Sequence, residues 1–103
     1  MRVYISGPMS GLKQEDYVNR FACAETGIRH DYKGCQVINP VAVTLYKQDM
    51  SYEELMQIDL DLLAKCDAIY LMRGWSQSLG CNRELGYALG RNMIILREER
   101  TRL

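Results

Sequence analysis

The apolar positions of this chain form short continuous runs that alternate with segments of helical periodicity. Runs of four to six mostly apolar residues, rich in β-branched and aromatic side chains, are typical of strands buried on both faces of a sheet. Four such runs predict four strands: residues 2–6 (RVYIS), 35–39 (CQVIN), 67–72 (DAIYLM) and 92–96 (NMIIL).

Helices are expected between these strands. The first is expected from Glu15 to Gly34, because apolar residues recur there at steps of four, three and four: Tyr17, Phe21, Ala24 and Ile28. The second follows Ser51 and Glu54, which have the spacing of a capping box. Its inner face is predicted at Leu55, Ile58, Leu62 and Cys66. A third helix is predicted over residues 81–90, whereas residues 41–50 show no clear period and predict a loop with at most a short turn.

This order of elements predicts an α/β fold with one domain over residues 1–103. The expected architecture is a doubly wound, Rossmann- or flavodoxin-like parallel sheet of four to five strands, with right-handed crossovers and helices on both faces. A chain of 103 residues is long enough for one core and too short for two. In such sheets the ligand binds outside the carboxyl ends of the strands, where the winding reverses. The loops after the first and third strands are therefore the expected site.

Composition and charge narrow the class of partner. Hydrophobic residues make up 48% and charged residues 25% of the chain, as in ordinary globular proteins. Thirteen Lys and Arg balance thirteen Asp and Glu, so no overall field would attract nucleic acid. No uninterrupted apolar stretch reaches about 18 residues and no apolar signal region follows Met1, so we expect no membrane association and a cytoplasmic location.

Neither a metal nor a cofactor is expected. The four cysteines form no Cys-x-x-Cys pair and lie within apolar runs, which predicts buried, reduced thiols at Cys23, Cys35, Cys66 and Cys81. His30 has no partner at ligand spacing and is expected at the surface.

Two loops carry the candidate binding residues. The first, Gly7-Pro8-Met9-Ser10-Gly11, combines two glycines with a hydroxyl but is neither a dinucleotide fingerprint nor a P-loop. The second, residues 74–80 (GWSQSLG), opens onto a helix whose first amides favour an anion. Ser76 and Ser78 are expected either to contact that anion or to cap the helix. Trp75 is expected to stack on a base or to pack at a dimer interface.

Two carboxylates are the candidate chemical groups. Glu84 lies in the first turns of the third helix, where it is either an ordinary surface glutamate stabilised by the helix dipole or a group beside the anion site. In a doubly wound fold Asp59 approaches from the preceding helix. Such a pair divides nucleophile and general-acid duties at an anomeric carbon.

An ordered combination of motifs now resembles a known family. The motifs are Tyr4-Ile5-Ser6-Gly7-Pro8-Met9-Ser10-Gly11, then Asp59 ahead of Cys66-Asp67-Ala68-Ile69-Tyr70, then Gly74-Trp75-x-x-Ser78-x-Gly80-x-x-x-Glu84-x-Gly86-x-Ala88. They resemble the nucleoside 2-deoxyribosyltransferase superfamily and, within it, the small, often phage-encoded domains numbered DUF4406. The chain is also similar to the 2′-deoxynucleoside 5′-phosphate N-glycosidases, and the resemblance spans nearly its whole length.

The resemblance implies roles for four residues. Glu84 would attack the anomeric carbon and form a glycosyl-enzyme intermediate, Asp59 would handle the proton of the departing base, and Tyr4 would hold Glu84 by a hydrogen bond. At the position of Ser78, transferases acting on free nucleosides carry an aspartate, whereas nucleotide N-glycosidases carry a serine near the phosphate. A carboxylate would repel a phosphate, so Ser78 favours a 5′-phosphorylated substrate.

Two features depart from the family pattern. Nucleotide glycosidases tend to have a basic residue in the first loop, where this chain has Ser10; Arg73 and Arg83 are expected either to compensate or to be solvated. Members also often complete a neighbouring subunit's pocket with a C-terminal residue, but residues 97–103 contain no recognisable lid. A homodimer or a larger homo-oligomer is nevertheless expected.

The sequence therefore predicts an N-glycosidase or 2-deoxyribosyltransferase acting on a (deoxy)nucleoside 5′-monophosphate through a covalent glycosyl-Glu intermediate. The main alternative is a non-catalytic module that binds a nucleotide or sequesters a nucleotide-derived signal, and a third is an oligomeric scaffold. Besides the catalytic candidates Glu84, Asp59 and Tyr4, the predicted substrate-binding residues are Gly7, Pro8, Met9, Ser10, Gly11, Trp75, Ser76, Ser78 and Gly80.

Overall fold

The structure is a computed structural model that describes residues 1–45 and 49–98. Its centre is a parallel sheet of four strands in the order β2-β1-β3-β4. The strands are β1 (Arg2–Ser6), β2 (Gln36–Ile38), β3 (Ala68–Leu71) and β4 (Ile94–Arg97). The chain winds from β1 to one side of the sheet and from β3 to the other, so the predicted doubly wound α/β fold is confirmed.

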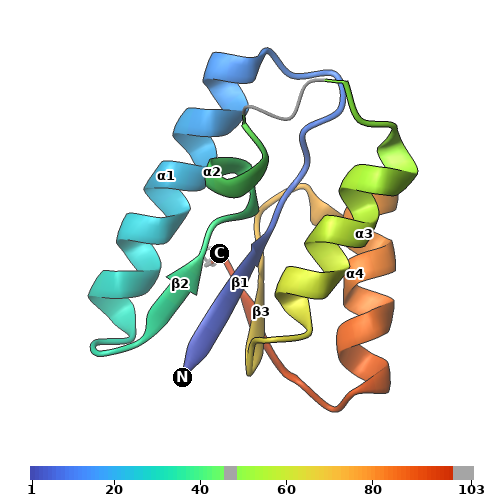
Figure 1. The fold of residues 1–103 in the computed structure, drawn as a ribbon. Helices are drawn as coiled ribbons and strands as arrows, with labels where there is room; N and C mark the ends of the chain where they lie inside the picture. The colour runs from blue at the N-terminus through green and yellow to red at the C-terminus, as the bar shows by residue number, and fades with distance from the viewer. Residues whose placement is uncertain (46–48, 99–103) are drawn as a thin grey trace.

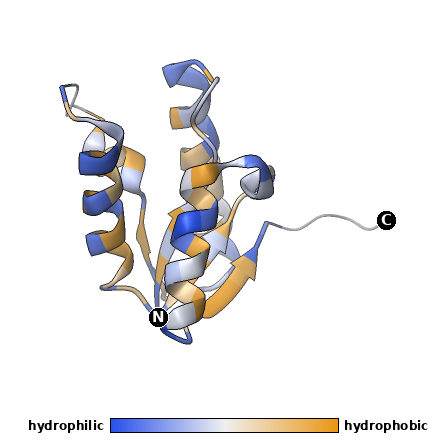
Figure 2. Ribbon diagram, turned by 90° about the vertical axis from the view of Figure 1, so that its right-hand side faces the viewer, coloured by the Kyte–Doolittle hydropathy of each residue, from blue (hydrophilic) through white to orange (hydrophobic). Residues whose placement is uncertain are grey.

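Helices cover both faces of the sheet (Figure 1). One face carries α1 (Gln14–Asp31) and the short α2 (Pro40–Thr44), and the other carries α3 (Tyr52–Leu63) and α4 (Leu79–Gly90). In Figure 2 hydrophobic residues concentrate on the strands and on the helix sides that face them. The core is therefore two apolar layers, one on each side of the strands.

Alternation along β1 assigns its side chains to these two layers. Val3 and Ile5 pack toward α1, whereas Tyr4 packs toward α3 and α4, and all three are fully buried. Successive strand residues point to opposite faces, so Ser6 lies on the Tyr4 side. This places two hydroxyl groups of β1 on the face that α4 covers.

Local signals account for most helix starts. Ser51 Oγ accepts from the backbone of Glu54 and the Glu54 carboxylate accepts from the Ser51 amide, at 3.1 and 2.8 Å, so the expected capping box is present. Residues 40–44 form a helix where only a loop or short turn was predicted. Asn39 caps this helix and Pro40 occupies its first turn. These two residues are a local signal for a helix start, although the segment lacks a helical spacing of apolar residues. Residues 46–48 of the expected loop lie outside the described residues.

The structure corrects the expected start of α4 and the expected burial of Cys23. Residues 75–77 form a short 3-10 helix, η1 (Trp75–Gln77), and α4 begins at Leu79 rather than at Cys81. Cys81 is buried, but Cys23 is exposed. Cys23 lies on the solvent-facing side of α1, which its apolar neighbours in the sequence do not indicate. Among the described helices none is long and apolar enough to cross a membrane.

Candidate active site

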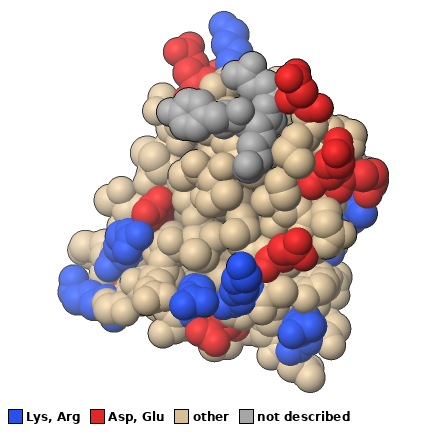
Figure 3. Space-filling model, in the orientation of Figure 1, with Lys and Arg blue, Asp and Glu red and all other residues tan. Residues whose placement is uncertain are grey.

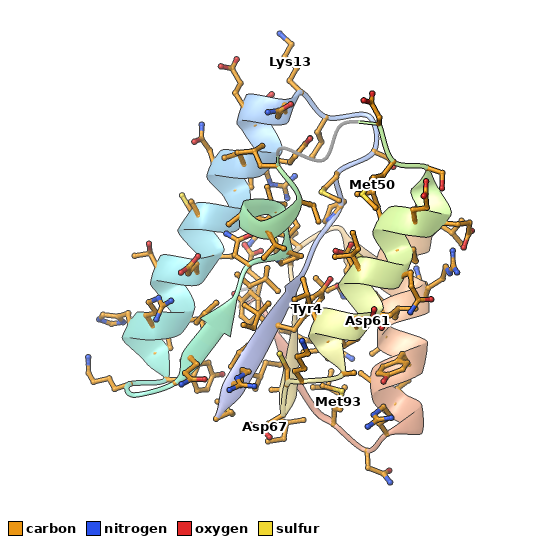
Figure 4. All side chains as sticks on the ribbon, viewed as in Figure 1. Tyr4, Lys13, Met50, Asp61, Asp67 and Met93 are labelled. Carbon is orange, nitrogen blue, oxygen red and sulfur yellow. The ribbon has the colours of Figure 1, made fainter. Side chains whose placement is uncertain are left out.

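A cavity of about 380 Å³ opens at the carboxyl ends of β1 and β3. Residues of the loop after β1, of α1, of α3 and of the start of α4 line it. Its volume is within the range of small-molecule sites, and it lies where the winding of the sheet reverses. In Figure 4 the Tyr4 side chain lies between β1 and α3, beneath this region.

Glu84 is the buried polar centre of the cavity. The residue is only 5% exposed, although it belongs to a helix on the outside of the sheet. Tyr4 Oη donates a hydrogen bond to Oε2 and Ser6 Oγ donates one to Oε1, each at 2.6 Å. Both oxygens of the carboxyl group are therefore held by hydroxyls from the same face of β1. The interpretation of Glu84 as an ordinary surface glutamate is wrong.

Burial and hydrogen bonding act on Glu84 in opposite directions. Removal from water raises the pKa of its carboxyl group, while the hydrogen bonds from Ser6 and Tyr4 lower it. The net direction is upward. For the Tyr4 hydroxyl, burial and the neighbouring acidic groups raise the pKa well above its ordinary value, so Tyr4 stays protonated and acts as a donor. The two hydroxyl donors thus favour the ionised form of the Glu84 carboxyl group, whereas burial opposes it.

Asp59 approaches the same cavity from α3. Its Oδ1 atom is buried and has no hydrogen-bond partner among the described residues. Burial, and secondarily the charge of Glu84, raise the pKa of the Asp59 carboxyl to about 7. A buried polar atom without a partner is uncommon in folded proteins, and strongly perturbed pKa values are concentrated at functional sites.

The two carboxyl groups have different hydrogen-bonding surroundings. Glu84 accepts two strong hydrogen bonds, whereas Asp59 accepts none at Oδ1 and holds its proton up to about neutral pH. Two titratable groups in one cavity with unlike environments are the usual arrangement of a base or nucleophile with an acid. The arrangement supports nucleophilic attack by Glu84 and proton donation by Asp59.

Ser78 caps α4 and also lines the cavity. It is the N-cap of α4, and its Oγ accepts a hydrogen bond from the amide of Cys81 at 3.2 Å. The side chain also lines the cavity. A hydroxyl that accepts from the backbone still has its own proton to donate, so Ser78 can cap the helix and contact a ligand together.

The predicted binding residues separate into two groups. Gly7, Met9, Ser10, Ser78 and Gly80 line the cavity together with Asp59 and Glu84. Pro8 and Gly11 are not among the residues that line it.

Trp75 and Ser76 line a different cavity, of about 200 Å³, where the Arg97 guanidinium lies 5.9 Å from the Trp75 ring. The prediction that Trp75 stacks on a base in the main cavity is therefore not supported. Left-handed Gly74 (φ +89°) precedes η1, and Trp75 packs against the core layer of α3 and α4.

The glycines of the first loop have structural causes. A Cβ at Gly7 would collide with Met72 Sδ and crowd Phe21, so glycine is needed there for close packing. Gly11 has φ +82°, a conformation that favours glycine in a turn. The small size of Gly7 thus serves the contact with Met72, and its backbone forms part of the cavity wall as a consequence.

Sequence reasoning missed several residues of the site. Ser6 is the most important, and its signal was its position two residues after Tyr4, on the same strand face. The others belong to helices and were assigned to the core or to no role: Tyr17, Tyr52, Leu55, Met56 and Cys81. Their identification needed the spatial arrangement of α1, α3 and α4.

The cavity lacks basic side chains among the residues that are described as lining it. Arg83 forms an ion pair with Glu53 at 3.0 Å and lies 5.6 Å from the Tyr52 ring, and Arg73 lines the cavity of Trp75. On the face in Figure 3, acidic side chains gather toward the upper right, while most Lys and Arg lie in the lower half. Neither arginine is among the described residues that line the cavity.

The described residues also contain no group of three or more His, Cys, Asp or Glu side chains placed to hold a metal ion. His30 is largely exposed at the end of α1, next to Asp31.

Comparisons with known proteins agree with this fold. The family model described as "Domain of unknown function (DUF4406)" matches residues 1–97. No curated protein matches the sequence. Among solved structures, a 2-desoxiribosyltransferase from Leishmania mexicana superposes with a TM-score of 0.61 at 20% identity, covering 93% of this chain and 62% of that chain. The chain thus spans less than two thirds of that transferase, and the likeness shows a common fold.

Replacing Ser6 by alanine is expected to raise the pKa of Glu84 further, because one of the two hydrogen bonds that favour its ionised form is removed. The measurement is an NMR titration of the Glu84 side-chain carboxyl carbon in the wild type and in Ser6→Ala. Ser10→Ala is the matched control, since Ser10 lines the cavity without a hydrogen bond to Glu84. A Glu84 titration that is the same in Ser6→Ala would contradict the role given to Ser6.

Replacing Asp59 by asparagine is expected to change how stability depends on pH. The pKa of Asp59 rises from an ordinary value of 3.8 to about 7 on folding, so the free energy of unfolding should decline as pH rises between these values. The decline from this one group is at most about 1.4 kcal/mol per pH unit. Asp59→Asn should lack it and should be more stable than the wild type above about pH 7, with little difference below about pH 4.

Urea unfolding across this pH range measures the effect. Asp61→Asn is the control, because Asp61 lies on the exposed side of the same helix. Parallel pH profiles for the wild type and Asp59→Asn would mean that Asp59 is ionised in the folded protein at acidic pH.

Proposed function

Because this chain belongs to the DUF4406 family and shares the fold of a 2-deoxyribosyltransferase, we propose that it cleaves or transfers the N-glycosidic bond of a (deoxy)nucleoside 5′-monophosphate. The observation that carries the proposal is the Glu84 carboxyl group, buried in the cavity with its two oxygens hydrogen-bonded to Tyr4 and Ser6, in the same cavity as Asp59, whose buried Oδ1 has no partner among the described residues. The proposal includes a homodimer or higher homo-oligomer acting in the cytoplasm.

The proposed reaction has two steps. In the first, a Glu84 oxygen attacks C1′ of the sugar while the bond from C1′ to the base nitrogen breaks, and the protonated Asp59 gives its proton to the departing base. A glycosyl ester of Glu84 and a neutral base result. In the second step, water or a second base attacks C1′ and gives a proton to the Asp59 carboxylate, which frees Glu84. Two displacements at the same carbon retain its configuration.

The hydrogen bonds from β1 support this division of roles. Two hydroxyl donors aim the Glu84 carboxyl group and favour its ionised, nucleophilic form. Each carboxylate oxygen has a second lone-pair site, so holding the group does not block attack. The pKa of Asp59, about 7, lets the same side chain give a proton in the first step and take one in the second near neutral pH.

The residues at the start of α4 support the proposal that the substrate carries a 5′-phosphate. Ser78 and Gly80 line the cavity there, where the free amides of a helix N-terminus and the Ser78 hydroxyl would be the phosphate donors. Because the described lining residues include no Lys or Arg, these donors would carry the interaction without a formal positive charge.

A binding module without turnover is the second candidate, and one observation favours it. Burial raises the pKa of Glu84, and a neutral carboxyl group would bind a ligand by hydrogen bonds without attacking it. Tight binding of an intact nucleotide, equal in the wild type and in Glu84→Gln and without product, would select this function.

Incubation with a panel of deoxynucleoside 5′-monophosphates tests the enzymatic proposal. The wild type should release free base, Glu84→Ala should release none, and quenched wild-type reactions should show the mass of a glycosyl group on the peptide that contains Glu84. Asp59→Asn should slow release by about a hundredfold to ten-thousandfold, the usual contribution of a general acid. Glu15→Gln, in the exposed first turn of α1, is the control. Base release by Glu84→Ala at the wild-type rate would exclude the nucleophile.

Replacing Ser78 by aspartate tests the position of the phosphate. Aspartate is as good an N-cap as serine, so α4 should remain intact while a carboxylate enters the proposed phosphate site. The ratio of kcat/KM for a nucleoside 5′-monophosphate to that for the nucleoside should fall by at least about tenfold, because like charges repel. Ser51→Asp, at the N-cap of α3, should leave the ratio unchanged. An unchanged ratio in Ser78→Asp would place the phosphate elsewhere.

A further inference from the structure

A second cavity, of about 370 Å³, borders the one that contains the two carboxyl groups. Met9, Tyr17 and Leu55 line both cavities. The second one continues between the start of α1 and α2, where Gln14, Val41, Thr44 and Leu45 line it. We name it the α2 lobe. The site therefore has two compartments that share one wall of apolar side chains.

The residues that line the two cavities show how the cavities are arranged relative to α4, α3 and α2. Ser78 and Glu84 stand on α4 at one end of the first cavity, and α2 bounds the far end of the second. Between them runs α3, which carries Asp59 and, one turn earlier on the same side of the helix, Leu55. A ligand group that leaves C1′ at Asp59 and extends toward Leu55 enters the α2 lobe.

The polar groups of the α2 lobe are uncharged among the residues described there. Thr44 Oγ1 donates its proton to the Pro40 carbonyl at 3.0 Å, so it faces a ligand only as an acceptor. The Gln14 side chain is exposed at the first residue of α1, and no hydrogen bond to it is found in the described structure. Its amide offers both a donor and an acceptor. Tyr17, Leu55 and Val41 supply flat or branched apolar surface.

We propose that the α2 lobe binds the base of the substrate and selects a ring that carries an exocyclic amino group. The inference rests on the proposed glycosidic function and specifies its substrate class. A heteroaromatic base suits a compartment with apolar walls and neutral polar groups, and a phosphate does not. The acceptor fixed at Thr44 matches an amino group, as in adenine or cytosine. A carbonyl in the same place, as in hypoxanthine or uracil, would face a second acceptor and leave both without a partner.

Thr44→Val tests the selection with nearly the same side-chain shape. The substrates are two matched pairs of 5′-monophosphates, those of deoxyadenosine and deoxyinosine and those of deoxycytidine and deoxyuridine. In at least one pair the wild type should prefer the amino-bearing member by about tenfold or more in kcat/KM, the value of one hydrogen bond. In Thr44→Val the preference in that pair should fall to about threefold or less.

Control variants isolate the effect. Thr26→Val is the matched control, because Thr26 makes the same hydrogen bond to the carbonyl four residues earlier, at 3.2 Å, on the exposed side of α1. Gln14→Leu should weaken binding of every base, and Gln57→Leu, on the exposed side of α3, should not. Thermal unfolding of each variant verifies that it is folded. A wild type without preference in either pair, or a preference that Thr44→Val preserves, overturns the proposal.

A binding experiment separates this inference from the proposed function. Titration of Glu84→Gln with the 5′-monophosphate of deoxyadenosine should shift the NMR signals of the Gln14 side-chain amide and the Thr44 backbone amide. If those signals shift but the wild type releases no base from any substrate, the glycosidic function fails and the α2 lobe remains a base site. If base is released but those signals do not move, the α2 lobe is not the base site.

Discussion

The site depends on one constraint, which is that a carboxyl group buried on α4 must find hydrogen-bond donors. Burial of an unpartnered carboxylate is costly, and Tyr4 and Ser6 of β1 offset that cost with two hydroxyls at 2.6 Å from Glu84. The two donors are available because they lie two residues apart on one strand and therefore on one face. This contact fixes how α4 sits on the sheet and where the carboxyl group points.

The doubly wound topology places the rest of the cavity around that contact. The chain leaves β1 toward α1 and leaves β3 toward α4, so the two departing loops separate at the carboxyl ends of adjacent strands. The helix that precedes β3 brings Asp59 to the same opening. Gly7 has no side chain because Met72 and Phe21 approach it closely, and its backbone becomes part of the wall.

Asp59 illustrates that a residue of the candidate site can lower the stability of the folded protein. A buried Oδ1 without a partner stabilises neither the helix nor the sheet, and its raised pKa means that the folded state resists ionisation of this group. A carboxyl group with a pKa of about 7 is able to give up a proton near neutral pH. Buried ionisable groups with a perturbed pKa are concentrated at functional sites.

The sequence by itself determined the four strands, the three long helices and their order, because continuous apolar runs, helical spacing and the Ser51–Glu54 pair are local properties of the chain. Through the order of motifs it also singled out Tyr4, Asp59, Ser78 and Glu84. Tertiary structure alone decided which loop residues share a cavity, because that depends on the packing of residues far apart in the chain. Trp75 lines a different cavity from the main one. Ser6 contacts Glu84 although the two residues are 78 positions apart, and no periodicity in the sequence predicts such a contact.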